Sequence, residues 1–159
     1  MKKVFLTIIL FQNLLFSQNF DRNVSLINIS DKIQTYCFEN LKPIKELDSI
    51  PAWRNHSCTI LDNLVLLQIK TENKSFDEKL KKSIFNRLLE ISNLFYLNKT
   101  PIILSSGMDS FFETNKKNKN LEDDNNIIYV SIGECTMPNN WYEAKNVFNS
   151  ETMKLINKK

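Results

Sequence analysis

Apolar residues recur every three or four positions in two stretches of the chain, which is the spacing of an amphipathic helix. The clearer stretch is 76–97, and Ser75 and Glu78 stand three residues apart at its start, as in a helix capping box. Its apolar residues are Phe76, Leu80, Ile84, Leu88, Ile91 and Phe95. The second stretch, 22–41, ends before Pro43, although its first apolar residues also fit a short strand. The pattern therefore predicts one long helix and a second helix nearer the N-terminus.

Three shorter apolar runs predict β-strands. The run LVLLQIK at 64–70 is apolar on both alternating faces, as in a central strand that is covered on both sides. The runs at 102–104 and 127–132 are typical of a short buried strand and of a strand with alternating faces. Because the long helix stands between the first two runs with short links, we expect those two strands to be parallel.

The remaining segments complete the expected fold. The stretch 115–126 is polar except for one leucine and predicts a surface loop, whereas 141–156 fits either a helix or a hairpin. Together the patterns predict an α+β fold, with a small mixed sheet of three to four strands, the long helix at about 76–97 and the second helix at about 22–41.

The first residues resemble an export signal. Two lysines precede the apolar run 4–16, which is shorter than the roughly 20 residues that span a bilayer but fits the apolar region of a signal peptide. We expect residues 1–17 to be removed by cleavage after Ser17, leaving 18–159 as a single globular domain. The protein would then be periplasmic or extracellular, with no stable membrane span.

Charge and glycine content exclude several functions. Removing the two lysines lowers the formal charge from +3 to about +1, so the chain has no net basic character for nucleic-acid binding. Only two glycines occur in 159 residues, and phosphate-binding loops need several because the backbone must approach the ligand closely. We therefore expect neither nucleic acid nor a nucleotide cofactor.

Histidine and cysteine give one candidate for catalysis. The single histidine excludes any site with two His ligands, and the three cysteines lack zinc-site spacing, so we expect no metal. His56 stands two residues before Cys58, and a thiol–imidazole pair of either Cys58 or Cys135 with His56 is a nucleophile with its base. Cysteines of exported proteins more often form disulfides. The sequence does not choose between a Cys37–Cys58 and a Cys58–Cys135 disulfide.

Polar residues after a buried strand are the first candidate binding site. Ser105, Ser106 and Asp109 follow the run at 102–104, and ligands of open α/β sheets bind at the carboxyl ends of strands. The alternative is a plain loop that leads into Phe111 and Phe112 as an anchor in the core.

An aromatic pair is the second candidate. Trp141 and Tyr142 fit an exposed contact for a carbohydrate or protein partner, or residues that pack a loop onto the core.

A well-patterned core without a catalytic constellation favours a non-enzymatic binding or interaction module, whose partner is a protein or another envelope component. The alternative function is a thiol-dependent hydrolase or transferase that uses Cys58 or Cys135 with His56. A structural subunit of a surface assembly is the third hypothesis.

Overall fold

The computed structural model describes residues 29–53, 56–119, 126–133 and 136–158. The chain divides into two units, residues 1–32 and 33–159, and only the second is described over most of its length. The predicted signal peptide lies outside the described residues. A helix at 29–40 is followed by η1 (Lys45–Ser49), η2 (Pro51–Trp53), α2 (Ile60–Leu66), α3 (Lys74–Leu97), β1 (Ile102–Ser105), α4 (Ser110–Lys119), β2 (Ile128–Ser131) and α5 (Asn139–Ile156).

The long helix α3 confirms the prediction for 76–97. It begins two residues earlier, because the side chain of Asn73 rather than Ser75 accepts a hydrogen bond from the backbone N–H of Phe76. Its buried apolar residues are Leu80, Ile84, Leu88, Ile91 and Phe95. These residues repeat at helical spacing, so α3 presents one apolar face to the core.

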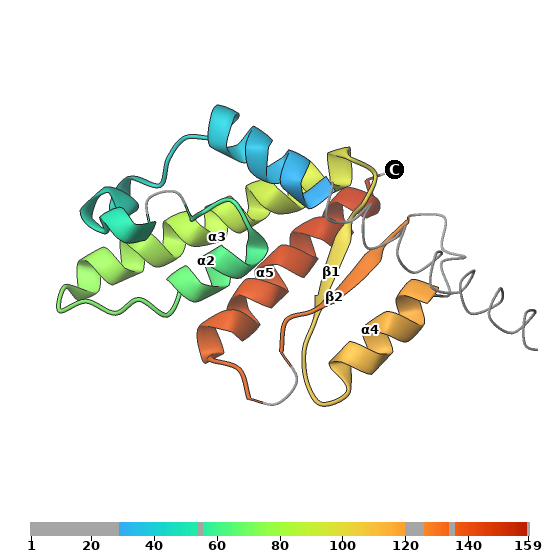
Figure 1. The fold of residues 1–159 in the computed structure, drawn as a ribbon. Coiled ribbons are helices and arrows are strands. Elements are labelled where there is room, and N and C mark those ends of the chain that lie inside the picture. Colours follow the sequence, from blue (N-terminus) through green and yellow to red (C-terminus); the bar gives the residue numbers. More distant parts are fainter. Residues whose placement is uncertain (1–28, 54–55, 120–125, 134–135, 159) are drawn as a thin grey trace, which may run out of the picture. The chain divides into compact units, whose positions relative to one another are not determined.

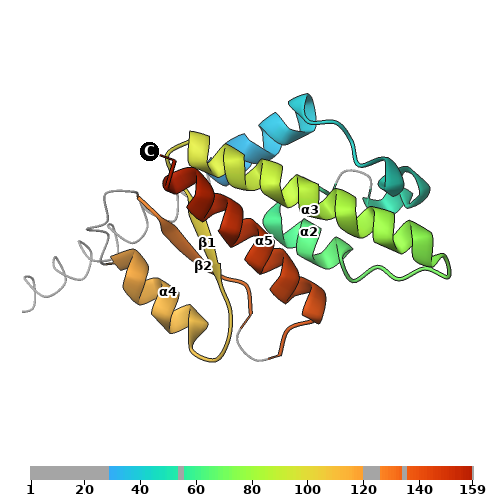
Figure 2. The ribbon, with the colours of Figure 1, turned by 180° about the vertical axis from the view of Figure 1, so that it is seen from behind.

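Helix α5 settles the choice between helix and hairpin at the C-terminal end. Ala144, Phe148, Thr152 and Ile156 are buried at spacings of four residues. This face packs along α3, as the two ribbon views show (Figures 1 and 2). Inside the contact, the hydroxyls of Ser92 and Thr152 hydrogen-bond to each other at 2.8 Å, so neither buried hydroxyl lacks a partner.

The predicted strand at 64–70 is wrong, because residues 64–66 belong to helix α2 and none of the seven is in a strand. Thr59 caps α2 by accepting a hydrogen bond from the N–H of Asp62 at 3.0 Å. Leu64 and Leu66 are fully buried. A short apolar run without clear periodicity suits a buried helix as well as a buried strand, and the cap decides for the helix here. The parallel pair expected between 64–70 and 102–104 is therefore also wrong.

The strands predicted at 102–104 and 127–132 are confirmed as β1 and β2. They pair in parallel with Ile102 opposite Ile128 and Ser105 opposite Ser131. The connection between them contains α4, as parallel pairing requires a crossover rather than a tight turn. The predicted loop at 115–126 is therefore helical over 115–119, and residues 120–125 lie outside the described part of the chain.

Only two strands occur in the described residues, so the predicted sheet of three to four strands is wrong. The side chain of Asn149 in α5 exchanges two hydrogen bonds of 2.8 Å with the backbone of Leu104, on the outer edge of β1. Asn118 in α4 does the same with the backbone of Tyr129 on β2, also at 2.8 Å. Figure 1 shows the resulting order α5, β1, β2, α4. Helix side chains replace the neighbouring strands at these points.

The second predicted helix is confirmed over residues 29–40, and 22–28 lie outside the described residues. Ile33 and Cys37 are buried, and Cys37 forms a disulfide with Cys58. The described chain contains five α-helices rather than the two predicted ones. Its mixture of helices and strands agrees with the predicted α+β class.

Candidate functional site

The structure bears on one of the two cysteines that were paired with His56 in the catalytic hypothesis. Cys58 is buried in the disulfide with Cys37, so it has no free thiol in this structure. The side chain of His56 is 54% exposed, and its Nδ1 lies 3.9 Å from the carboxylate of Asp62. Cys135 lies outside the described residues. Among the described residues, the imidazole therefore lies near a carboxylate.

The carboxyl end of β1 leads directly into α4 through a tight loop, residues 106–109. Gly107 has φ 115° and Asp109 has φ 68°, both in the left-handed region, where Gly is unrestricted and Asp is tolerated better than most residues. The N–H of Gly107 donates to the carbonyl of Gly133 at 2.9 Å, just after β2. The loop is thus fixed by its own backbone conformation and by the neighbouring strand.

Ser110, the first residue of α4, fixes this loop to the end of β2. Its buried hydroxyl lies 2.6 Å from the hydroxyl of Ser131 and donates to the carbonyl of Gly133 at 3.1 Å. These bonds join the start of α4 to the end of β2. The loop is therefore held in one position relative to the carboxyl ends of both strands.

Lys145 of α5 joins the two predicted binding candidates. Its Nζ donates to the hydroxyl of Ser106 at 2.8 Å and lies 5.3 Å from the ring centre of Tyr142. Within the described residues it forms no ion pair with a carboxylate. Ser106 and Tyr142 were predicted separately, and the residue between them was missed. The spacing of Tyr142 and Lys145, three apart in a helix, is the signal that could have found it.

The two aromatic residues of the predicted pair have different roles. The indole N–H of Trp141 donates to the carbonyl of Leu64 at 2.7 Å, and the side-chain amide of Asn140 donates to the carbonyl of Leu67 at 3.0 Å. Both bonds satisfy carbonyls at the C-terminal end of α2, which a helix leaves without internal partners. Trp141 therefore packs α5 onto α2, whereas Tyr142 is exposed beside Lys145.

Three large apolar side chains lie exposed on the same loop and the first turn of α4. Met108 is 80% exposed, Phe111 is 52% and Phe112 is 70%. The two phenyl rings contact each other edge to face with centres 5.8 Å apart. The idea that Phe111 and Phe112 anchor the loop in the core is therefore wrong. We call these three residues the apolar tip. The loop that leads from β1 into α4 is at the lower end of that helix in Figure 1.

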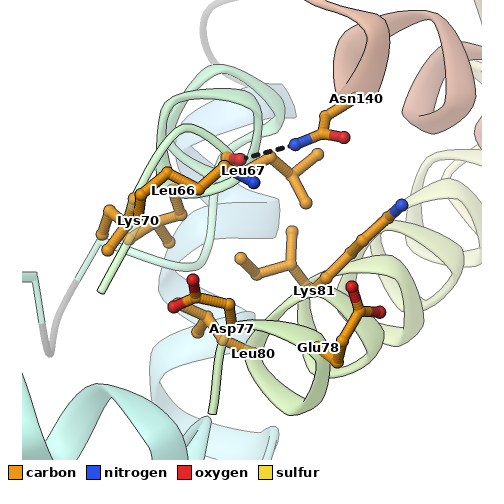
Figure 3. Close-up of a pocket in the computed structure, with 10 residues that line it drawn as sticks. Leu66, Leu67, Lys70, Asp77, Glu78, Leu80, Lys81 and Asn140 are labelled. Carbon is orange, nitrogen blue, oxygen red and sulfur yellow. Dashed lines mark hydrogen bonds between the residues drawn. The ribbon is translucent and has the colours of Figure 1, made fainter. Parts of the chain in front are cut away.

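A small hollow lies between α2, α3 and the first turn of α5. Figure 3 shows the hydrogen bond from Asn140 to Leu67 above it and charged side chains around it. Its volume of about 30 Å³ has room for a single water molecule. The carboxylate of Asp77 already accepts bonds from the N–H and hydroxyl of Thr71, and Lys81 pairs with Glu143 at 2.6 Å. This hollow is too small to enclose a drug-sized ligand.

The described residues contain no group of three His, Cys, Asp or Glu side chains placed to bind a metal ion. In the same part of the chain, no helix combines the length and the apolar character that crossing a bilayer requires. Comparisons with protein-family models, with curated proteins and with solved structures give no significant match.

Proposed function

We propose that this protein is a non-enzymatic binding module of the periplasm or the cell exterior. Its partner is a protein segment that carries a large apolar side chain next to a carboxylate. The observation that carries the proposal is the apolar tip, Met108, Phe111 and Phe112, on the loop 106–109 and the first turn of α4. The same loop contains Ser106, whose hydroxyl accepts a hydrogen bond from Lys145 of α5.

The apolar tip supplies the contact area for this partner. Contiguous exposed apolar side chains are uncommon on soluble proteins and mark interaction sites. Aromatic side chains contribute much of the binding free energy at interfaces, because they cover a large area with few rotatable bonds. Phe111 and Phe112 are held at the start of α4 by a loop that is fixed to both strands, so little ordering is needed on binding.

Lys145 supplies the charge preference. It is half-buried, oriented by Ser106 and Tyr142, and unpaired with any carboxylate of the described residues. An incoming carboxylate would gain a charge-assisted hydrogen bond with an ammonium group whose position is already set. An acidic side chain or a C-terminal carboxylate is therefore the expected partner group.

Export is the second component of the proposal. The lysine pair, the apolar run at 4–16 and the Cys37–Cys58 disulfide together support an oxidising compartment. Expression with secretion in a bacterial host should yield a chain that begins at Gln18, measured by N-terminal sequencing. A mature chain that still begins at Met1 would contradict export.

The thiol-dependent alternative needs a free thiol beside His56. Cys58 is bonded to Cys37, and Cys135 lies outside the described residues. No observation favours this alternative over a binding module, so it is not proposed.

A display library of random peptides with free C-termini tests the binding function. We expect the retained peptides to share an apolar side chain and a carboxylate. Their affinity should fall at least about tenfold, or 1.4 kcal/mol, for Phe112→Ser and for Lys145→Met. The matched controls are Leu61→Ser, which changes a similarly exposed apolar residue of α2, and Lys154→Met, which changes a basic residue elsewhere on α5.

The controls should bind as the unchanged protein does. If no peptide is retained, or if the Phe112 and Lys145 variants bind the retained peptides as well as the controls do, the proposed function is wrong.

A further inference from the structure

The Cys37–Cys58 disulfide is in direct contact with a buried charge. Arg87 of α3 is only 4% exposed, and its Nη1 donates to the Sγ of Cys37 at 2.9 Å and reaches the Sγ of Cys58 at 3.5 Å. Its Nη2 donates to the carbonyl of Lys42. A disulfide sulfur is neutral and accepts hydrogen bonds weakly. Part of the guanidinium therefore points at groups that do little to balance its charge.

The charge of Arg87 has one carboxylate partner. Glu90 lies three residues further along α3, with its Oε2 2.9 Å from the Nε of Arg87. The side chain of Glu90 is about half exposed, and the Nε–H of Arg87 has no properly oriented hydrogen-bond acceptor. A buried charge is costly unless it is both paired and hydrogen-bonded. A negative charge on the sulfur of Cys37 would meet that need at hydrogen-bond distance.

We propose that Cys37–Cys58 is a site of reversible thiol–disulfide exchange with dithiols, in which Arg87 stabilises the reduced state by holding Cys37 as a thiolate. A cationic neighbour favours the thiolate form of a cysteine. The shorter of the two contacts from Nη1 selects Cys37 rather than Cys58 as the charged sulfur. This site is separate from the apolar tip and does not depend on the proposed binding function.

The exchange balances as follows. One thiolate of the dithiol bonds to the Sγ of Cys58, the S–S bond of the protein breaks, and Cys37 leaves with the electron pair as a thiolate. The second thiolate of the dithiol attacks the mixed disulfide, and the Sγ of Cys58 leaves and takes up a proton. The protein gains two electrons and one proton, while the dithiol becomes a disulfide and its other proton is released to solvent.

Because both cysteines are buried, the equilibrium of the exchange rather than its rate should be measured. Cys37 and Cys58 are buried, so a dithiol reaches them only after a local opening and exchange should be slow. The position of equilibrium, however, depends only on the free energies of the oxidised and reduced proteins. Arg87 acts on that equilibrium, because its charge is balanced better in the reduced form.

The experiment equilibrates the full chain with mixtures of reduced and oxidised dithiothreitol at neutral pH, followed by acid quenching and alkylation. Mass spectrometry then gives the oxidised fraction of the Cys37 and Cys58 peptides. The key variant is Glu90→Gln, which removes the competing carboxylate but leaves Arg87 in place. We expect its equilibrium constant to shift toward the reduced form by about threefold to tenfold, tenfold being the effect of one pKa unit.

The matched control is Glu78→Gln, which removes the same charge from the same helix about 18 Å from Glu90, at 1.5 Å per residue. Its equilibrium should stay within about twofold of the unchanged protein, less than one third of a pKa unit. Arg87→Gln should shift the equilibrium the opposite way, toward the disulfide. The ultraviolet thiolate absorbance of the reduced protein should rise in Glu90→Gln and fall in Arg87→Gln.

A purely structural role for Arg87 predicts different results. In that case Glu90→Gln would leave both the exchange equilibrium and the thiolate absorbance unchanged, and this outcome would overturn the proposal. The exposed position of Glu90 makes its variant suitable even if the Arg87 variants do not fold. A shift of Glu90→Gln toward the disulfide would also refute the proposal.

Discussion

Two regions of the protein contrast in what they bury. Around Arg87 a charged side chain is buried, whereas the loop between β1 and α4 exposes apolar side chains. At Arg87 a charged side chain is buried with a disulfide, a carbonyl and one carboxylate around it. At the loop, Met108 and Phe112 are exposed, while the backbone beneath them is tied to both strands. A buried charge requires partners that pair with it and hydrogen-bond to it, whereas an exposed phenyl ring leaves its apolar surface free to bind a partner.

The largest expected effect separates a buried phenylalanine from an exposed one. Phe148 of α5 is fully buried, so Phe148→Ala should lower the free energy of unfolding by about 3–5 kcal/mol. Phe112→Ala makes the same chemical change on the apolar tip and should alter it by less than about 0.5 kcal/mol. Denaturant unfolding of both variants measures the difference. If Phe112→Ala destabilised the protein as much as Phe148→Ala, the tip would belong to the core.

A smaller effect is expected where a helix side chain closes the edge of the sheet. Asn149→Leu leaves the N–H and carbonyl of Leu104 without their partners, which should lower the free energy of unfolding by about 1–3 kcal/mol. Asn146→Leu is the matched control, because Asn146 is exposed on the same helix and should change stability by less than about 0.5 kcal/mol. Equal stability of the two variants would show that this edge closure contributes nothing.

The elements with the strongest local patterns could be predicted from the sequence. The periodic stretch at 76–97 is a helix, because helical spacing gathers its apolar residues on one face that packs against the core. The runs at 102–104 and 127–132 are strands. The run at 64–70 failed because it is apolar on every face and has no period to distinguish helix from strand. The number of strands was predicted wrongly for another reason. Asn149 closes the edge of β1 from 45 residues away, which no local pattern reveals.

The candidate binding site was predicted in separate pieces. Ser106 follows a strand and Tyr142 belongs to an aromatic pair, and each was a candidate without reference to the other. Lys145 brings them together only because α5 returns beside β1. Phe111 and Phe112 were the least predictable, because apolar residues beside a buried strand are ordinarily part of the core.

The sequence by itself determined the helix at 76–97, most of the helix at 29–40, the strands at 102–104 and 127–132, and that two cysteine pairings deserved consideration. Only the tertiary structure decided that Cys37 bonds to Cys58 and that Arg87 of α3 contacts this disulfide. It also decided that two asparagines hydrogen-bond to the outer edges of a two-stranded sheet. The physical reason is that periodic burial is a property of neighbouring residues along the chain. Contacts between buried polar groups depend instead on how the whole chain returns on itself, because their partners come from segments that are distant in sequence.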